Sequence, residues 1–240
     1  MKKILIVDDD ESILLLVSKY LTKSGYTIVT ERNGKDALST LRDNEDIALI
    51  ITDIVMPFMD GVELCRTIRG EPKFERMPIL MLTSMSDISN KYMGFDSGAD
   101  DYLTKPFEPL ELLLRVQSLL KKYEYFKENK RDEEASIENP NAKIKIDKKD
   151  YSVHINNKSV YLTLTEFDIL YYLYQNFTRP VPVEELLQKV MGYPPRTGNP
   201  EIIRTHIKNI RAKIEDESSE NPKVITTVPR RGYLFNKELA

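Results

Sequence analysis

The chain has 240 residues, 41% of them hydrophobic, which is enough for two ordinary domains with separate cores. No apolar stretch reaches the roughly 20 residues that span a bilayer, and the N-terminus runs directly into a strand-like segment, so we expect a cytoplasmic protein without membrane anchor or signal peptide. The net charge of -3 divides unevenly: residues 1–122 carry 20 acidic and 16 basic side chains, residues 123–142 carry 6 and 3, and residues 143–240 carry 12 and 16. This asymmetry is compatible with an acidic N-terminal half that holds a cation and a basic C-terminal half that meets nucleic acid.

Apolar runs alternate with amphipathic segments along residues 1–122. Strands are expected at Lys3–Val7, Tyr26–Val29, Ile47–Thr52, Pro78–Leu82 and Asp101–Thr104, and helices include residues 13–21, 34–41 and 110–120. Strands that alternate with helices predict an α/β domain with a parallel, doubly wound, five-stranded sheet. In such sheets the functional site lies at the carboxyl ends of the strands.

The composition changes at residues 123–142, which are polar, charged and end in turn formers, so we expect a linker there. Beyond it, short strands are expected at residues 143–146, 152–155 and 159–162, helices at 165–177, 183–190 and 201–215, and a closing hairpin at 224–228 and 232–235. Thr163 or Thr165 is a candidate N-cap for the first of these helices. Residues 143–240 therefore form a second domain of the α+β class.

Carboxylates follow two of the expected strands in the first domain. Asp8 and Asp9 come after the first strand, and Asp53 comes directly after the Ile47–Thr52 strand. Three converging carboxylates repel one another unless a cation neutralises them, and their hard oxygens are the ligands that Mg²⁺ or Mn²⁺ prefers. With such a cation present, Asp53 would remain ionised and could attack phosphorus in line.

Two more polar side chains follow buried strands. Lys105 could supply a second positive contact to phosphoryl oxygens, and Thr83 could supply a hydroxyl donor. Any single polar residue at a strand end is as often a solvated turn residue as a functional one. The set is more informative, because its members occur in order and each follows a separate expected strand.

Residues 1–122 resemble the receiver domain of response regulators. The motifs that carry the resemblance are Asp8-Asp9, Asp53 followed by Met56-Pro57 and Asp60-Gly61, Thr83, and Lys105-Pro106-Phe107. The resemblance implies that Asp53 accepts a phosphoryl group from a sensor histidine kinase, and that Lys105 holds this group. It also implies a Mg²⁺ site made of Asp8, Asp9, Asp53 and the backbone carbonyl of Val55, and a conformational switch made of Thr83 and Tyr102. The Lys105-Pro106 peptide bond is typically cis in such domains.

Charged residues also mark one expected face of the domain. In the OmpR/PhoB branch, which the chain resembles, matching positions pair across a symmetric receiver homodimer: Lys91 with Glu111, Asp101 with Arg115, and Asp100 with Lys122. The alternative is an ordinary solvated face, on which ion pairs contribute little.

The expected helix at residues 201–215 has two faces. Its buried stripe consists of Ile203, Ile207, Ile210 and Ile214. Its exposed side carries Arg204, Lys208 and Arg211, with Thr205 and Asn209 alongside. Such side chains read base edges and phosphates in a major groove. On its own, the pattern fits an ordinary amphipathic helix equally well.

A second basic element, Pro229-Arg230-Arg231-Gly232-Tyr233, lies in the closing hairpin. Residues 143–238 resemble the winged helix-turn-helix effector domain of OmpR/PhoB-type regulators, through Leu164-Thr165-Glu166-Phe167, Arg204-Thr205-His206-Ile207 and Arg231-Gly232-Tyr233. The resemblance places Arg204, Thr205, Lys208, Asn209 and Arg211 in the major groove of promoter DNA, and Thr227, Arg230, Arg231 and Tyr233 on the wing. Asn209 is the candidate for base readout, because a carboxamide can pair with adenine through two hydrogen bonds. The loop Met191–Pro200 corresponds to one that can touch RNA polymerase in this family.

Two other classes of function remain open at this point. An aspartyl nucleophile with Mg²⁺ also serves haloacid-dehalogenase-like phosphohydrolases, but these place a second Asp two residues after the nucleophile, where this chain has Val55. We therefore expect a regulator and not an enzyme. A phosphorylation-regulated adaptor, whose C-terminal domain binds only proteins, is the other alternative.

Overall fold

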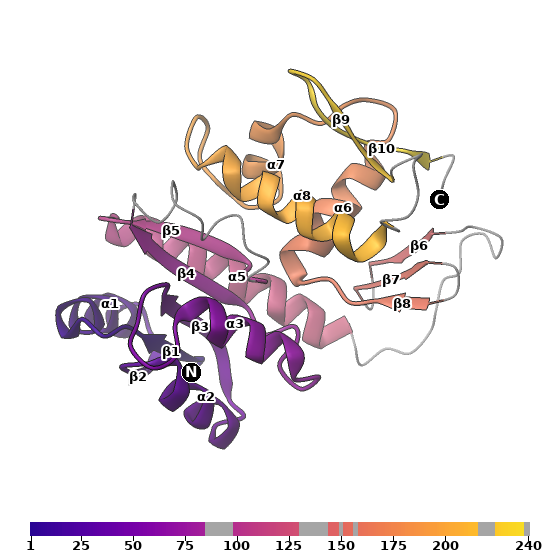
Figure 1. Ribbon diagram of the computed structural model, residues 1–240. Helices are drawn as coiled ribbons and strands as arrows, with labels where there is room; N and C mark the ends of the chain where they lie inside the picture. Colours follow the sequence, from indigo (N-terminus) through magenta and orange to yellow (C-terminus); the bar gives the residue numbers. More distant parts are fainter. Residues whose placement is uncertain (85–97, 130–143, 149–150, 156–157, 216–223, 238–240) are drawn as a thin grey trace. The chain divides into compact units, whose positions relative to one another are not determined.

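The computed structural model describes residues 1–84, 98–129, 144–148, 151–155, 158–215 and 224–237 (Figure 1). The chain divides into two compact units, an N-terminal unit of residues Met1–Tyr123 and a C-terminal unit of residues Glu124–Ala240. Within the described residues, no helix combines the length and the apolar character needed to cross a bilayer.

The N-terminal unit is built around a parallel five-stranded sheet with the order β2-β1-β3-β4-β5. Its strands are β1 (Lys3–Val7), β2 (Thr27–Glu31), β3 (Ile47–Asp53), β4 (Ile79–Ser84) and β5 (Asp101–Lys105), and its described helices are α1 (Glu11–Lys23), α2 (Gly34–Asp43), α3 (Gly61–Gly70) and α5 (Pro109–Asn129). The expected α/β fold is confirmed. Because the strand order reverses at β1, the carboxyl ends of β1 and β3 lie next to each other at the switch point of the sheet.

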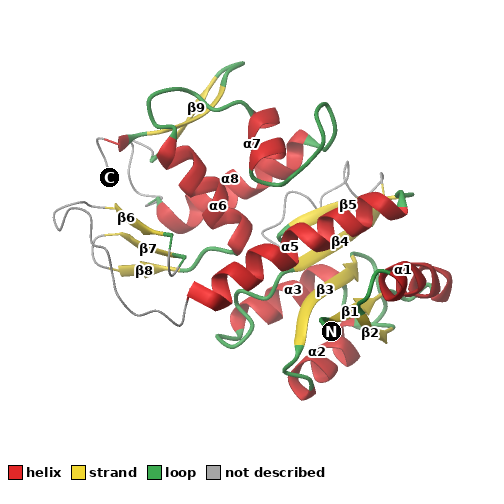
Figure 2. Ribbon diagram, turned by 180° about the vertical axis from the view of Figure 1, so that it is seen from behind, coloured by secondary structure: helices red, strands yellow, loops and turns green. Residues whose placement is uncertain are grey.

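Alternate residues of each strand serve opposite faces of this sheet. Ile4 and Ile6 of β1 belong to a cluster with side chains of α1 and α5, whereas Leu5 and Val7 are equally buried on the opposite face. Figure 2 shows α5 on one side of the sheet and α3 on the other. The continuous apolar runs in the sequence follow from this burial on both faces.

Helix α5 is longer than the sequence analysis predicted. It ends at Asn129, so the first seven residues of the expected linker, 123–129, are helical, while the two units divide between Tyr123 and Glu124. Tyr123 and Phe126 are both 8% exposed, and they continue at helical spacing the buried positions Val116 and Leu119. The charged residues between these positions made the segment look like a linker, although its helical periodicity was intact.

The C-terminal unit combines two small antiparallel sheets with three helices. Strands β6 (Ile144–Asp147), β7 (Ser152–Ile155) and β8 (Lys158–Val160) form one sheet, and β9 (Ile225–Val228) pairs with β10 (Gly232–Phe235) in a hairpin. Helices α6 (Leu164–Gln175), α7 (Val183–Lys189) and α8 (Pro200–Ile214) lie between the two sheets (Figures 1 and 2). This is the expected winged-helix arrangement.

A capping box starts α6. Thr163 Oγ1 accepts a hydrogen bond from the backbone N–H of Glu166, and the Glu166 carboxylate accepts one from Thr163 N at 2.8 Å. Lys213 of α8 donates to the same carboxylate at 2.7 Å, although Glu166 has no exposed surface. Of the two candidate N-caps, the structure selects Thr163.

Candidate functional site

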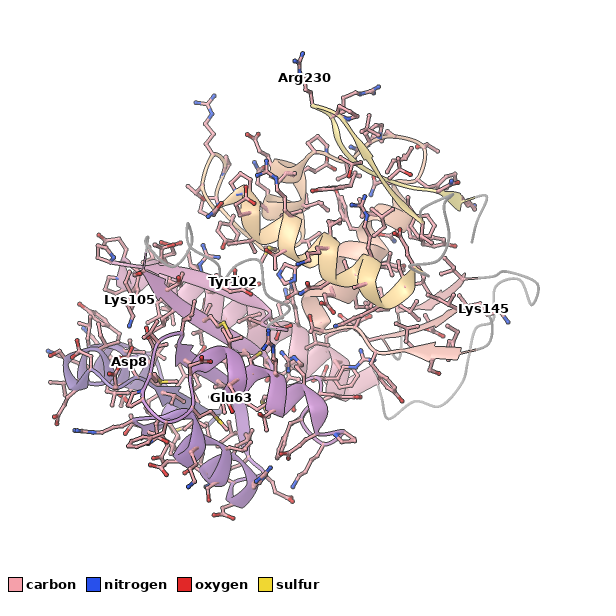
Figure 3. All side chains as sticks on the ribbon, viewed as in Figure 1. Asp8, Glu63, Tyr102, Lys105, Lys145 and Arg230 are labelled. Carbon is pink, nitrogen blue, oxygen red and sulfur yellow. The ribbon has the colours of Figure 1, made fainter. Side chains whose placement is uncertain are left out.

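Asp8, Asp53 and Lys105 meet at the carboxyl edge of the parallel sheet. Lys105 Nζ donates to Asp8 Oδ2 at 2.7 Å and to Asp53 Oδ1 at 2.5 Å. Figure 3 shows Asp8 and Lys105 at this end of the sheet. Asp8 is 1% exposed, and the side chain of Asp53 is 14% exposed. Three strands, β1, β3 and β5, thus supply two carboxylates and one ammonium group to a single site.

Burial and the neighbouring charges act in opposite directions on the pKa of Asp8, and likewise on that of Lys105. Burial raises the pKa of Asp8 above its usual value, and the hydrogen bond from Lys105 opposes this rise only in part. Burial also acts to lower the pKa of Lys105, but its hydrogen bonds to Asp53 and Asp8 outweigh burial, so that its pKa is raised. Lys105 is therefore protonated at neutral pH and bridges the two carboxylates.

Asp9 does not join this cluster. It is exposed, and the described residues include no group of three or more His, Cys, Asp or Glu side chains arranged to hold a metal ion. Asp9 lies beyond the end of β1, directly after the inward-facing Asp8, and its expected role as a third metal ligand stays a prediction. The carboxylate oxygens of Asp8 and Asp53 are suitable ligands for a small hard cation, because both carboxylates already bind the positively charged Lys105 Nζ.

Backbone contacts fix the loop that follows Asp53. Val55 N donates to Asp53 Oδ2 at 2.8 Å, and Gly61 N donates to Ile54 O at 2.9 Å. A Cβ atom on Gly61 would lie 2.0 Å from the carbonyl oxygen of Asp53, so only glycine permits this close approach. Asp60 caps α3 by accepting a hydrogen bond from Glu63 N at 2.8 Å. The Asp60-Gly61 motif thus shapes the loop after the strand that ends in Asp53.

The two expected switch residues are both buried. Thr83 has no exposed surface and its hydroxyl donates to Ser84 O at 3.1 Å, while Tyr102 is 5% exposed. They lie on the neighbouring strands β4 and β5, where Thr83 pairs with Thr104. The Lys105-Pro106 peptide bond is cis, as expected.

The expected dimer residues bind partners within the chain. Arg115 donates to Asp101 at 2.9 Å and to Glu111 at 2.6 Å, and its side chain is 6% exposed. Lys122 is partly buried on α5, and Lys91 lies outside the described residues.

Asp100 is also bound within the chain. Its carboxylate, 1% exposed, accepts hydrogen bonds from Arg69 Nη2 at 2.8 Å and Ile79 N at 3.0 Å. Arg69 also donates to the carbonyl oxygens of Gly98 and Met77. The expected pairing of Asp100 with Lys122 of a second chain stays a prediction, and it would require Asp100 to exchange these bonds. Sequence reasoning missed Arg69, because its position in the last turn of α3 gives no sign of a partner 31 residues away.

In the C-terminal unit, α8 exposes a narrower basic face than expected. Asn199 caps the helix by accepting a hydrogen bond from Glu201 N at 2.9 Å, with Pro200 in the first turn. Arg204 and Lys208 are exposed, and Arg204 forms an ion pair with Glu201.

Thr205 and Asn209 are buried, at 7% and 3% exposed. With Ile202 and His206 they form a second row of covered side chains, at helical spacing beside the isoleucine stripe. Their expected contact with DNA stays a prediction.

The hairpin supplies further basic groups. Thr227, Arg230 and Arg231 are exposed, and Figure 3 shows Arg230 at the hairpin tip. Arg211 and Tyr233, two expected DNA contacts, also contact each other: the Arg211 guanidinium lies 5.9 Å from the centre of the Tyr233 ring, and Tyr233 is 7% exposed.

Comparison with known proteins agrees with this arrangement in both units. Residues 4–117 match the family described as "Response regulator receiver domain", and residues 157–235 match "Transcriptional regulatory protein, C terminal". The "Alkaline phosphatase synthesis transcriptional regulatory protein PhoP" of Bacillus subtilis is 37% identical over 98% of this chain and 97% of its own length. The "Regulatory protein VanR" of Enterococcus faecium is 37% identical over 98% and 99%. The chain belongs to the OmpR/PhoB-type response regulators.

Other matches extend across the length of this response regulator. The "Probable transcriptional regulator ycf27" of Porphyridium aerugineum is 36% identical over 98% of the chain and 96% of its own length. A solved structure of a RitR mutant has a TM-score of 0.71 and covers 99% of this chain and 100% of that one, but at 21% identity it shows the fold alone.

The response regulator is a two-component protein with a receiver domain and a DNA-binding domain, and its family consists of transcriptional regulators and not of enzymes. Receiver domains generally bind Mg²⁺ at the phosphorylation site, and the family implies a kinase partner and DNA binding.

Proposed function

We propose that Asp53 accepts a phosphoryl group from a sensor histidine kinase, and that the phosphorylated chain dimerises and binds promoter DNA sequence-specifically. The observation that carries this proposal is the Asp53 carboxylate, which is partly exposed at the end of β3 and held by Lys105 Nζ at 2.5 Å and Val55 N at 2.8 Å. These two donors hold the carboxylate in a fixed orientation, which favours in-line attack on phosphorus.

In the proposed transfer, a carboxylate oxygen of Asp53 forms a bond to phosphorus while the bond from phosphorus to the kinase histidine breaks. The electron pair of that bond stays on the imidazole nitrogen. Mg²⁺, held by Asp8, Asp53, the backbone carbonyl of Val55 and a reoriented Asp9, would offset charge on the transferring group. Lys105 would exchange part of its contact with the carboxylates for a phosphoryl oxygen. Thr83 and Tyr102 would then report the phosphoryl group to the β4 and β5 edge.

For DNA binding, the exposed cations of α8 and the hairpin are the candidates. Arg204 and Lys208 would enter the major groove, while Arg230 and Arg231 would reach phosphates or the minor groove. Thr205 and Asn209 lie on the same helix, and their expected contacts in the major groove remain part of this proposal. Phosphate contacts of this kind make binding strongly dependent on salt.

Dimerisation is proposed to use Asp101, Glu111 and Arg115. Their bonds within the chain, at 2.6 and 2.9 Å, would be exchanged for the same bonds between two chains. Such an exchange keeps the number of ion pairs constant, so phosphorylation has only to shift the balance between closely matched states. Sedimentation of phosphorylated Arg115→Ala should show monomers where the unchanged chain shows dimers.

The loop Met191–Pro200 is proposed to contact RNA polymerase. Arg196 is exposed there and has a positive φ of 61°, a conformation that turns the chain sharply. In reconstituted transcription, Arg196→Ala should lower transcript yield while DNA affinity stays unchanged. Equal losses of both would contradict this role.

The proposed function is tested by phosphorylating the full chain with a small-molecule phosphodonor and titrating DNA selected from a random pool against salt. We expect phosphorylation to tighten binding, with Asp53→Asn as the unresponsive control, and binding to weaken steeply as salt rises. An adaptor that binds only proteins would bind no DNA in either state, and this result would reject the DNA-binding part of the proposal.

A further inference from the structure

We propose that Arg211 and Glu215 form a clamp that sets the position of the β9–β10 hairpin relative to α8, and that Arg211 is a positioning residue and not a DNA contact. This inference rests on the proposed DNA-binding function and deepens it, because it concerns how two separate DNA-contacting elements are held in register.

The clamp closes on the backbone of one residue. Arg211 Nε and Nη2 donate to the carbonyl oxygen of Ile225 at 3.0 and 2.7 Å, and Glu215 Oε1 accepts from the N–H of the same residue at 3.0 Å. Arg211 lies in the last turn of α8, and Glu215 is the C-cap residue that follows the helix, with its backbone N–H donating to Arg211 O at 2.8 Å. Both backbone groups of Ile225, which has no exposed surface, are thus bound by the last turn of α8 and its cap.

Arg211 reaches further along the hairpin. Its Nη2 atom donates to Thr227 Oγ1 at 3.0 Å, and its guanidinium lies over the ring of Tyr233 in β10. Two of its three nitrogen atoms are therefore occupied by β9. This planar, multiple contact is one that a guanidinium makes and an ammonium cannot.

The far strand of the hairpin is fixed independently. Tyr233 and Val181 exchange two backbone hydrogen bonds of 2.9 and 2.7 Å. Gly232 has a φ of 115°, and a Cβ atom there would lie 1.9 Å from Val181 O. With β10 anchored in this way and β9 held by the clamp, the hairpin tip with Arg230 and Arg231 has a defined position relative to Arg204 and Lys208.

The functional consequence concerns specific binding more than general affinity. A DNA site that is contacted by both α8 and the hairpin is bound more tightly when these two elements already have the correct relative position. Binding then costs no conformational entropy to order them. Binding to unrelated DNA depends mainly on the number of phosphate contacts. Loss of the clamp should therefore lower the ratio of specific to non-specific affinity while the salt dependence stays the same.

The decisive variants are Arg211→Lys and Glu215→Ala in the phosphorylated full chain. Arg211→Lys retains the charge but loses the planar contact, and Glu215→Ala removes a negative charge, which by electrostatics alone favours DNA. We expect both to weaken binding to the selected site about tenfold, in line with the loss of a hydrogen bond to a charged group, with an unchanged salt slope and unchanged affinity for unrelated DNA. Lys208→Gln is the reference for a direct phosphate contact, and it should weaken both DNAs and reduce the salt slope by about one.

A readout without DNA completes the test. Amide exchange at residues 225–228 of the free chain should accelerate in both clamp variants, while exchange in α6 stays unchanged, which also shows that the variants fold. If the wild-type chain binds no DNA, the proposed function is rejected, and amide exchange at residues 225–228 then tests the clamp by itself. Unchanged exchange at residues 225–228 would overturn the clamp. A third variant, Arg211→Gln, distinguishes the clamp from a direct phosphate contact. If Arg211→Gln weakens binding to both DNAs and reduces the salt slope as Lys208→Gln does, while Glu215→Ala leaves binding to the selected site unchanged, the clamp is also overturned.

Discussion

Lys105 Nζ lies 2.5 Å from Asp53 Oδ1, which joins the last residue of β5 to the last residue of β3 across 52 positions of sequence. The same nitrogen atom neutralises the buried Asp8 at 2.7 Å. This ammonium group bridges the two carboxylates at the carboxyl edge of the sheet and offsets their mutual repulsion.

We therefore predict that Lys105→Gln lowers the free energy of unfolding in metal-free buffer by about 1–3 kcal/mol, because Asp8 keeps a buried charge without its cation. Mg²⁺ should restore more stability to the variant than to the unchanged chain, since Lys105 no longer competes for the carboxylates. Urea unfolding with and without MgCl₂ measures both effects. Lys3→Gln is the control, because Lys3 pairs with the exposed Asp46 and its loss should cost below about 1 kcal/mol. Equal responses of both variants to Mg²⁺ would contradict the prediction.

Arg69 is predicted to be important for the stability of the receiver domain. Arg69→Gln removes donors to Asp100 and to the carbonyl oxygens of Gly98 and Met77, and leaves a carboxylate that is 1% exposed without its guanidinium. We expect a loss of about 2–4 kcal/mol in the free energy of unfolding, because an uncompensated buried charge is costly. Double-mutant analysis with Asp100→Asn measures the coupling. If the two losses simply add, Arg69 and Asp100 do not interact as described.

The end of α5 is predicted to belong to the core of the C-terminal unit. The Phe126 ring lies 5.9 Å from that of Tyr151, which in turn lies 4.5 Å from the ring of Phe167. Phe126→Ala should destabilise the C-terminal unit by about 3 kcal/mol, the usual cost of emptying a buried aromatic position. Amide exchange of α6 in the full chain provides the measurement. Phe58→Ala is the control, because Phe58 is 89% exposed. If residues 123–129 were only a linker, neither variant would change the amide exchange of α6.

A pH dependence is predicted at the contact between α6 and α7. The hydrogen bonds from Arg179, at 2.6 and 2.9 Å, lower the pKa of Glu185 below its ordinary 4.5, and Tyr172 contributes at 2.7 Å. Because the folded pKa is depressed, the stabilisation is complete above the unfolded pKa and is lost as pH falls through the folded pKa. Glu185→Gln should therefore cost about 1 kcal/mol at pH 7. Thermal unfolding at a series of pH values should show the difference from wild type shrinking below pH 4.5. A difference that is constant with pH would rule out the carboxylate as its source.

The local residue pattern was sufficient to predict much of the fold of this protein and part of its site. Apolar runs that alternate with helical segments predicted the parallel sheet, and the strand-end positions of Asp8, Asp53 and Lys105 predicted that they meet. The helical spacing that places Tyr123 and Phe126 in α5 was also present in the sequence, and the charged residues between them obscured it.

The tertiary structure decided which polar groups are bound or buried within the chain. Asp100 is bound by Arg69, and Arg211 is bound to the backbone of Ile225. Asn209 is buried beside the isoleucine stripe of α8. Helical and strand periodicity depend on the backbone alone and can be read from one segment at a time. The partner of a charged side chain depends on which distant segment packs beside it, and only the folded arrangement of the whole unit determines this.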